Sequence, residues 1–218
     1  MNESQLREEI CRVGASLFAR GYAHATAGNI SARLPDGFLI TPTDACLGAL
    51  DPARLSKVSS GGEPVDGDRP SKTLALHRRI YEADAAAQCV IHTHSTHLVA
   101  LTLQGVWSER DILPPITPYF VMKVGHVPLV AYHRQGDPRV GDHVAARIAE
   151  SRAAGRPIRA VMLDRLGPNV WGTTPAEAMA TLEELEETAR LWLMCDPRPQ
   201  PLDDDAIDAL RQAFGARW

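Results

Sequence analysis

The sequence predicts a single α/β domain, in which strands and helices alternate without a simple repeat. Short apolar runs bounded by turn residues indicate buried strands, and apolar residues at helical spacing indicate amphipathic helices. The chain has 218 residues, of which 44% are hydrophobic, so it is long enough to bury a sizeable core. No internal repeat is found, and no clear domain break precedes residue 196.

Six segments are expected to be helical because their apolar residues recur every three or four positions. These are residues 4–20, 71–82, 96–103, 140–152, 174–194 and a final stretch around 207–214. Leu6, Ile10 and Leu17 form the apolar stripe of the first helix. Ser71 is expected to cap the second helix by accepting backbone amide bonds. Residues 174–177 (Thr-Pro-Ala-Glu) form a capping box, so the fifth helix should begin there, with its glutamate run facing solvent.

Five segments are expected to be strands because they are short, apolar and bounded by turn residues. These are residues 38–41, 89–92, 127–132, 159–163 and 169–171. Pro42 ends the first, and a Gly167-Pro168 turn is expected to separate the last two. Residues 59–70 indicate a hairpin-like or loop region, and the proline-rich residues 107–119 indicate an irregular loop.

Composition and charge argue against several classes of function. The net charge is −4 with both signs mixed, so there is no basic stripe for nucleic acid and no polybasic patch for a membrane surface. No apolar run approaches the roughly 18 residues of a membrane span. The first residues lack the basic and apolar regions of a secretory signal. The four scattered cysteines form no C-x-x-C pair, which predicts reduced thiols in a cytoplasmic protein.

The most informative motif is Val90-Ile91-His92-Thr93-His94-Ser95. A short apolar run ends in two histidines two positions apart, and residues i and i+2 of a strand point to the same side. Two imidazoles at the carboxyl end of a strand are placed to hold one divalent metal and to leave positions open for substrate. The alternative is a pair of ordinary polar residues at a strand-to-helix turn.

Three short polar turns accompany this motif, at residues 26–29, 41–43 and 70–72. Gly28 would let the backbone approach a ligand, while Thr26 and Asn29 offer side-chain donors. Ser71 is expected at a helix N-terminus, where amide groups favour an anion, and Lys72 adds a cation. Together the turns could form a phosphate cradle, although each one alone is more often simple turn chemistry.

Five segments in register resemble the class II aldolase/adducin family. They are residues 25–31, 39–43, 69–72, 92–95 and 167–172. Further segments, among them residues 117–119 and 182–189, resemble the 3-oxo-tetronate 4-phosphate decarboxylase branch of that family. The resemblance extends from about residue 5 to 195, so we expect one domain over residues 1–196. Residues 197–218 are expected to form a proline-rich linker and a helix that belongs to this domain or packs on a neighbouring subunit.

The resemblance implies a three-layer α/β/α sandwich around a central mixed, largely antiparallel sheet. It also implies a homotetramer with active sites between subunits, and one divalent metal, most often Zn²⁺, with Mn²⁺ and Fe²⁺ as alternatives. The implied activity is that of a carbon–carbon lyase of carbohydrate metabolism, of decarboxylase or aldolase type. Its substrate would be a sugar-acid phosphate or a similar keto/hydroxy compound, cleaved through a metal-stabilised enediolate.

The resemblance also implies roles for individual residues. His92 and His94 match two of the family's three metal histidines. Tyr119 matches a tyrosine of the decarboxylase branch and is a candidate proton donor, the alternative being a loop residue packed among prolines. The residues that match the family's phosphate-binding turns are Thr26, Gly28, Asn29, Thr43, Ser71 and Lys72.

Three positions depart from the family pattern. Thr73 stands at the place of the acid/base glutamate, and a threonine hydroxyl cannot titrate near neutral pH. Leu166 stands at the place of the third metal histidine and cannot bind metal. Asp44 stands where relatives carry glycine beside Thr43, and its charge opposes a phosphate there. The candidates for a replacement third ligand are His97, His126, His133 and Asp164.

These observations leave three hypotheses open. The first is a lyase with an altered active site, which the histidine pair and the phosphate turns favour. The second is a non-catalytic member, like the adducin head domain, that binds a ligand or partner without turnover; the losses at positions 73 and 166 favour it. The third is a changed metal site that runs different chemistry, on a non-phosphorylated acid or with iron.

Overall fold

The computed structural model describes residues 1–218, and its centre is one eight-stranded sheet. The strands are β1 (Asn29–Leu34), β2 (Gly37–Ile40), β3 (Ser56–Ser59), β4 (Pro64–Asp66), β5 (Cys89–His92), β6 (Leu129–Val130), β7 (Ala160–Leu163) and β8 (Gly167–Gly172). They are ordered β4-β3-β2-β1-β5-β8-β7-β6, and only the β6–β7 pair is parallel. The expected mixed, largely antiparallel sheet is therefore confirmed.

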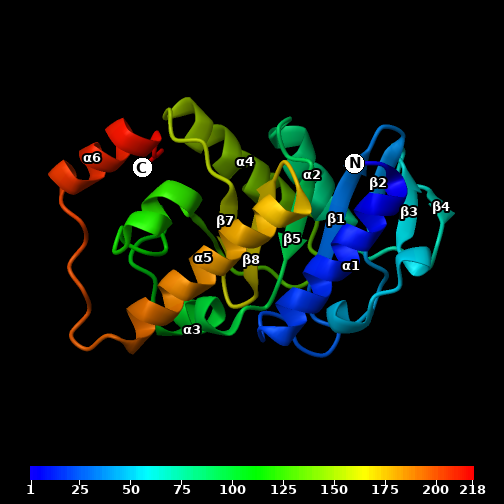
Figure 1. Ribbon diagram of the computed structural model, residues 1–218, viewed down its shortest axis with the longest axis horizontal. Coiled ribbons are helices and arrows are strands. Elements are labelled where there is room, and N and C mark those ends of the chain that lie inside the picture. The colour runs from blue at the N-terminus through cyan, green and yellow to red at the C-terminus, as the bar shows by residue number, and fades with distance from the viewer.

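Helices cover both faces of this sheet (Figure 1). They are α1 (Glu3–Ala19), α2 (Leu74–Ala83), α3 (Thr96–Gln104), α4 (Arg139–Ala153), α5 (Pro175–Met194) and α6 (Asp204–Phe214). One apolar cluster joins α1, α3 and α5 to the face that carries Ile30 and Ile91. A second cluster joins α2 and α4 to the face that carries Val90 and Trp171. Because strand side chains alternate between faces, the two clusters make the three-layer sandwich that the family resemblance implied.

The register of β5 decides which residues surround its histidine. His92 lies opposite Asn29 of β1 on one side and opposite Asn169 of β8 on the other. Directly opposite residues share a face of the sheet, so the three polar side chains stand in one row on the α2/α4 face. The candidate site thus begins at one end of β5, one of the two central strands.

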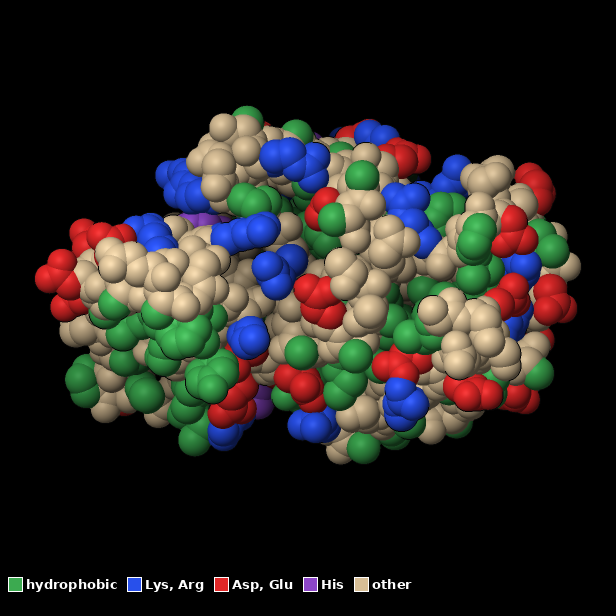
Figure 2. All heavy atoms as spheres, turned by 45° about the horizontal axis from the view of Figure 1, so that its top comes forward, with side chains coloured by type: hydrophobic (Ala, Val, Ile, Leu, Met, Phe, Trp, Pro, Cys, Tyr) green, Lys and Arg blue, Asp and Glu red, His purple; other side chains and the backbone are tan.

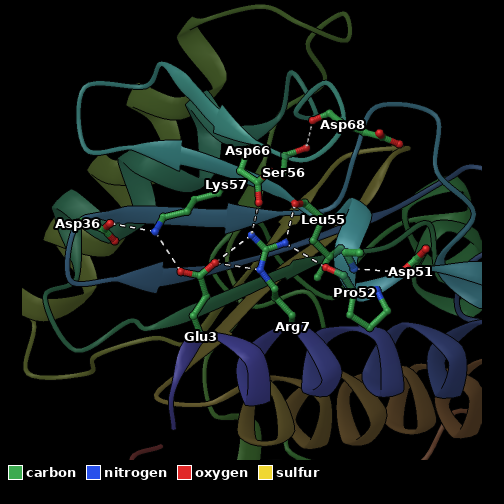
Figure 3. Close-up of polar contacts among 11 residues, drawn as sticks. Glu3, Arg7, Asp36, Asp51, Pro52, Leu55, Ser56, Lys57, Asp66 and Asp68 are labelled. Atoms are coloured by element: carbon green, nitrogen blue, oxygen red, sulfur yellow. Dashed lines mark hydrogen bonds and ion pairs between the residues drawn. The ribbon is translucent and has the colours of Figure 1, made fainter.

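The first helix is tied to the β3–β4 edge by a polar network (Figure 3). Arg7 donates to the backbone carbonyl oxygens of Pro52 at 3.0 Å and of Leu55 at 2.9 Å. Lys57 of β3 pairs with Glu3 at 3.0 Å and with Asp36 at 2.9 Å. Arg7 thereby satisfies two carbonyl groups in the segment that leads into β3 and fixes α1 over this part of the sheet.

Three element boundaries differ from the prediction. The second helix begins at Leu74, because residues 71–73 form a turn in which the Leu74 amide donates to the Ser71 carbonyl at 3.2 Å. The sixth strand covers only Leu129–Val130. The turn between β7 and β8 lies at residues 164–166, so Gly167 and Pro168 are paired strand residues rather than a turn. Arg165 makes this turn with a left-handed backbone, at φ 61°.

One glutamate of α5 contradicts the expectation of a solvated face. Glu186 is only 3% exposed, and its carboxylate accepts from the backbone amides of His97 at 2.9 Å and of Leu98 at 3.1 Å. These amides belong to the first turn of α3, where backbone donors have no helical partner. Glu186 therefore fastens α5 to the start of α3.

The last residues fold back onto the short π-helix η3 (Phe120–Val124) and its neighbourhood. The amide of Leu202 donates to the Pro115 carbonyl at 2.8 Å, and Ile207 of α6 is buried. The ring of Trp218 stacks on His126 with centroids 4.4 Å apart. α6 consequently lies at the left end of the molecule in Figure 1. None of the helices combines the length and the apolar character needed to cross a membrane.

Candidate active site

His92 and His94 lie together where β5 ends and before α3 begins. His92 is 5% exposed and His94 is half-buried. Their ring centroids are 5.1 Å apart, with the ring planes 68° from parallel. Two imidazoles on one tetrahedral zinc, with Zn–N bonds of about 2.1 Å, have centroids about 5 Å apart. The spacing of the pair therefore fits a shared metal ion.

The protonation state of the pair also fits metal binding. The His92 Nδ1 donates to the backbone carbonyl of Pro168 at 2.9 Å, which leaves the lone pair on Nε2. Burial, with a smaller effect of His94, lowers the pKa of His92 to about 4. Burial, followed by the nearby His24, lowers the pKa of His94 as well. Both rings are thus neutral at pH 7, which is the form that binds a metal.

The first polar turn rests directly on this pair. Gly28 has φ +90°, and a Cβ there would lie 2.9 Å from the His92 carbonyl oxygen. Only glycine allows this turn to approach the strand so closely. Asn29, the next residue, is buried and begins β1 opposite His92. Gly28 and Asn29 thus lie beside His92, whereas Thr26 is exposed.

The other two turns are hydrogen-bonded to each other and to β1. The Thr41 amide donates to the Ile30 carbonyl at 3.0 Å. The Ser71 amide donates to the Thr41 carbonyl at 3.3 Å, and the Thr43 hydroxyl donates to the Pro70 carbonyl at 2.9 Å. Chain segments 28–30, 41–43 and 70–71 are thereby joined into one polar surface beside β5.

The positions that depart from the family pattern lie around this surface. The Thr73 hydroxyl is 2.8 Å from the Ser71 hydroxyl, so it takes part in the third turn. Asp44 is exposed and has a left-handed backbone, at φ 59°, a conformation that glycine adopts more easily. Leu166 packs against the apolar cluster of the α2/α4 face. Lys72 is exposed.

Tyr119 does not join the site within one chain. Its side chain is 59% exposed, and it directly precedes η3, the turn that packs against α5 and α6. No hydrogen bond connects it to the histidine pair or to the three turns.

The four residues considered as a replacement third ligand are engaged elsewhere. His97 Nδ1 lies 2.8 Å from Glu186, and His126 Nδ1 lies 2.8 Å from Asp111. His133 stacks on His143, and Asp164 lies 4.0 Å from Arg165. In the chain as folded, no three His, Cys, Asp or Glu side chains are already grouped to hold an ion.

A different histidine, which the sequence analysis missed, faces the pair. The ring of His24 is exposed and lies 6.2 Å from that of His94, between centroids, at an interplanar angle of 72°. Its proximity depends on the Gly28 turn folding back over β5, which no local spacing reveals. The only sequence signal is that His24 stands two residues before Thr26.

A buried polar cluster lies on the α2 side of His92. His77 Nδ1 is 2.7 Å from the Ser31 hydroxyl, which is 2.7 Å from the Tyr81 hydroxyl. His77 Nε2, Asn29 Oδ1 and both side-chain polar atoms of Asn169 are buried without a partner. Unpaired buried polar atoms are rare in folded proteins and indicate a place for ordered water or a bound polar group.

A groove elsewhere on the surface does not coincide with these residues. It has a volume of about 530 Å³ and lies beside α5, lined by Arg20, Lys123 and Arg159 together with several glutamates. None of the predicted site residues lines it.

The comparisons with known proteins agree with this geometry. The model of the class II aldolase and adducin N-terminal domain matches residues 8–193. A 3-oxo-tetronate 4-phosphate decarboxylase of Cupriavidus necator is 58% identical over 221 residues, covering 99% of each chain. Another from Escherichia coli K12 is 46% identical over 199 residues, covering 90% of each.

Solved structures show the same fold. The crystal structure of YgbL from Klebsiella pneumoniae has a TM-score of 0.85 at 45% identity, covering 97% of this chain and 100% of that one. L-fuculose-1-phosphate aldolase from Thermus thermophilus has a TM-score of 0.70 at 29% identity, covering 86% and 92%. From its match to the family model, its relatives and its fold, this chain belongs to the class II aldolase and adducin family.

Proposed function

We propose that this protein is a metal-dependent carbon–carbon lyase that decarboxylates a 3-oxo sugar-acid phosphate of the tetronate type. The observation that carries the proposal is the pair of neutral imidazoles, 5.1 Å apart, beside a surface of three joined polar turns. The 58% and 46% identical relatives, which are 3-oxo-tetronate 4-phosphate decarboxylases, support a lyase over the non-catalytic alternative.

His92 and His94 would hold the metal through their free ring nitrogens. Neutral imidazole suits Zn²⁺, which we propose as the native ion, although Mn²⁺ and Fe²⁺ also accept such ligands. When bound, the ion supplies a Lewis acid that takes up negative charge developing on a substrate ketone oxygen. The chain's own task is to keep both rings unprotonated, which burial achieves, and to fix the His92 tautomer, which the Pro168 carbonyl achieves.

The joined turns would bind the phosphate group of the substrate. Thr26, Gly28 and Asn29 form the first turn, and its backbone lies against the His92 carbonyl. The hydroxyl-bearing residues Thr43 and Ser71 belong to the other two turns, and the exposed Lys72 supplies the cation at the rim. Hydrogen bonds that involve a charged partner are about twice as strong as neutral ones, so a phosphate is well suited to this surface.

The chemistry of the bond explains why a decarboxylase tolerates threonine at position 73. When the bond between the carboxylate carbon and its neighbour breaks, carbon dioxide leaves and the electron pair is delocalised onto the ketone oxygen. No base is needed first, because the carboxylate is already ionised. The neighbouring carbon then takes one proton from water or from a nearby hydroxyl group, and the product is a ketone one carbon shorter. An aldol cleavage instead needs a base to remove a hydroxyl proton, which Thr73 cannot do.

We further propose that the protein is a cytoplasmic homo-oligomer, with a tetramer as the expected form. Hydrophobic side chains gather at the end of the molecule that carries α6 (Figure 2). Phe214, the last residue of α6, and Met194, the last residue of α5, are each 68% exposed. Exposed apolar patches of this kind are typical of protein interfaces. The exposed Tyr119 could then deliver a proton to the site of a neighbouring subunit.

Metal analysis combined with a carbon dioxide assay tests the proposal. The wild-type protein should carry about one divalent ion per chain, and His92→Ala should lose both the ion and decarboxylation of 3-oxo-tetronate 4-phosphate. His143→Ala, an exposed histidine on α4, is the matched control and should lose neither. A native protein that stays metal-free after growth with zinc and manganese, or a fully active His92→Ala variant, would contradict the proposal.

A further inference from the structure

The histidine pair leaves the metal with too few protein ligands. Catalytic zinc sites have three protein ligands and an open position for water or substrate. Leu166 occupies the place where the family resemblance puts the third histidine, and it packs among apolar side chains. If His92 and His94 hold an ion, a third donor has to come from another part of the chain.

His24 is placed to be that donor. Its ring meets His94 at 6.2 Å between centroids, while His94 meets His92 at 5.1 Å, so the three rings form a continuous series. Rings that share a tetrahedral ion have centroids about 5 Å apart, so His24 lies about 1 Å farther from His94 than a ring bound to the same ion would. The ring is exposed and makes no hydrogen bond, so turning it toward the pair breaks no side-chain contact of this kind.

The backbone holds His24 at this place. The Ala27 amide donates to the His24 carbonyl at 2.9 Å, which closes the turn. Gly28 then presses the same turn against the His92 carbonyl oxygen, where a Cβ would lie only 2.9 Å away. One short segment thus presents His24 to the metal position and also provides the first turn of the phosphate surface.

We propose that His24 is the third protein ligand of the ion held by His92 and His94. The inference rests on the proposed function, because it presupposes that the histidine pair binds a metal. Three neutral imidazoles leave the ion its full double charge. That arrangement suits a substrate that carries both a carboxylate and a phosphate, since the ion's charge is not already neutralised by a protein carboxylate.

Metal affinity measured on the purified full-length chain tests the ligand role without any assay of activity. The protein is stripped with a chelator and titrated with Zn²⁺ by calorimetry, as wild type, His24→Ala and the control His143→Ala. His24→Ala should weaken zinc binding at least about 10- to 100-fold, which is already the effect of losing a group that only orients a ligand. His143→Ala should bind as tightly as the wild type.

A spectroscopic variant shows whether residue 24 touches the ion. With Co²⁺ in place of zinc, His24→Cys should give a thiolate-to-cobalt charge-transfer band in the near ultraviolet that the wild type lacks. Unchanged zinc affinity in His24→Ala, together with no such band in His24→Cys, would overturn the inference and leave the two-histidine proposal standing. A wild-type protein that binds neither ion would overturn the proposed function as well, so the two failures are distinguishable.

Discussion

Gly167 lies directly against the carbonyl oxygen of Thr93, so closely that a Cβ on Gly167 would be 1.9 Å from that oxygen. The contact joins the start of β8 to the connection that carries His94. With φ +143°, Gly167 also has a backbone conformation that other residues rarely adopt. This one position therefore controls how closely the two strands approach at the histidine pair.

Gly167→Ala should lower the free energy of unfolding by at least about 2 kcal/mol, because it adds a clash to a strained backbone. Urea denaturation measures the loss. Gly155→Ala is the matched control, since Gly155 also has a positive φ of +73° but no atom within 4 Å of an added Cβ. Its cost should be about 1 kcal/mol, from the backbone alone. An equal decrease in the free energy of unfolding in the two variants would show that the contact with Thr93 does not contribute to stability.

Glu186 should contribute far more to the free energy of unfolding than its neighbour Glu187. Removing the buried carboxylate in Glu186→Ala leaves two backbone amides at the start of α3 without partners, at a cost of about 2–4 kcal/mol. Glu187→Ala breaks only a partly exposed pair with Arg190 and should change stability by less than about 1 kcal/mol. Thermal unfolding of both variants measures the difference. A similar melting temperature for the two would contradict the assigned role of Glu186.

His77 should make the protein less stable as the pH falls. Burial, with a smaller effect of His92, lowers the pKa of His77 to about 3 from 6.5. Below pH 6.5 the unfolded chain takes up a proton at this residue, whereas the native protein stays neutral until about pH 3. Stability is therefore lost between these values as the pH falls, by about 2 kcal/mol at pH 5 for this one group.

Replacing His77 by glutamine removes that titration. The difference in unfolding free energy between pH 7.5 and pH 5, measured with a chelator present, should be about 2 kcal/mol smaller in His77→Gln than in the wild type. His143→Gln, on the exposed side of α4, should leave the difference unchanged. An unaltered pH dependence in His77→Gln would mean that the native imidazole titrates like that of the unfolded chain.

Ser71 should act on the phosphate group and not on the bond that breaks. Ser71→Ala is expected to raise KM for the phosphorylated substrate about 10-fold or more, since a hydrogen bond to a charged group contributes about 1.5–3 kcal/mol. Inorganic phosphate should inhibit this variant correspondingly less. Turnover of the analogue without the phosphate should be unaffected. If both substrates lose activity equally, Ser71 supports the fold of the turn and does not bind phosphate.

Much of the scaffold could be predicted because local signals and tertiary packing agree. The strand Cys89–His92 is found with the predicted bounds, and the helix that follows Thr174 begins at Pro175 as the capping pattern requires. Strand pairing could not be predicted in this way, because the order of strands in the sheet depends on contacts between residues that are distant in the sequence. The sequence also misplaced the β7–β8 turn, because Gly167 resembles a turn residue yet serves a close approach inside β8.

The site was predictable only where its residues follow one another along the chain. His92 and His94 share one strand end, so their spacing alone places them together. His24 joins them through the folding back of a turn, which leaves no periodic pattern in the sequence. The rings of His97, His126 and His133 are each in contact with another side chain. Their contacts come from Glu186, Asp111 and His143, and the spacing of residues along the sequence does not reveal these contacts.

Ala25, Asp44 and Arg165 all hold a left-handed backbone, at φ 48°, 59° and 61°, without being glycine. A left-handed conformation costs an ordinary residue roughly 1–2 kcal/mol. Ala25 and Asp44 adjoin Thr26 and Thr43, so part of this strain lies at the proposed phosphate surface. Asp44→Gly should relax the backbone there. If the proposed phosphate surface binds substrate, the same exchange also removes a carboxylate that would repel the phosphate group. This single substitution would then raise both stability and activity, although substitutions that improve one of them usually impair the other.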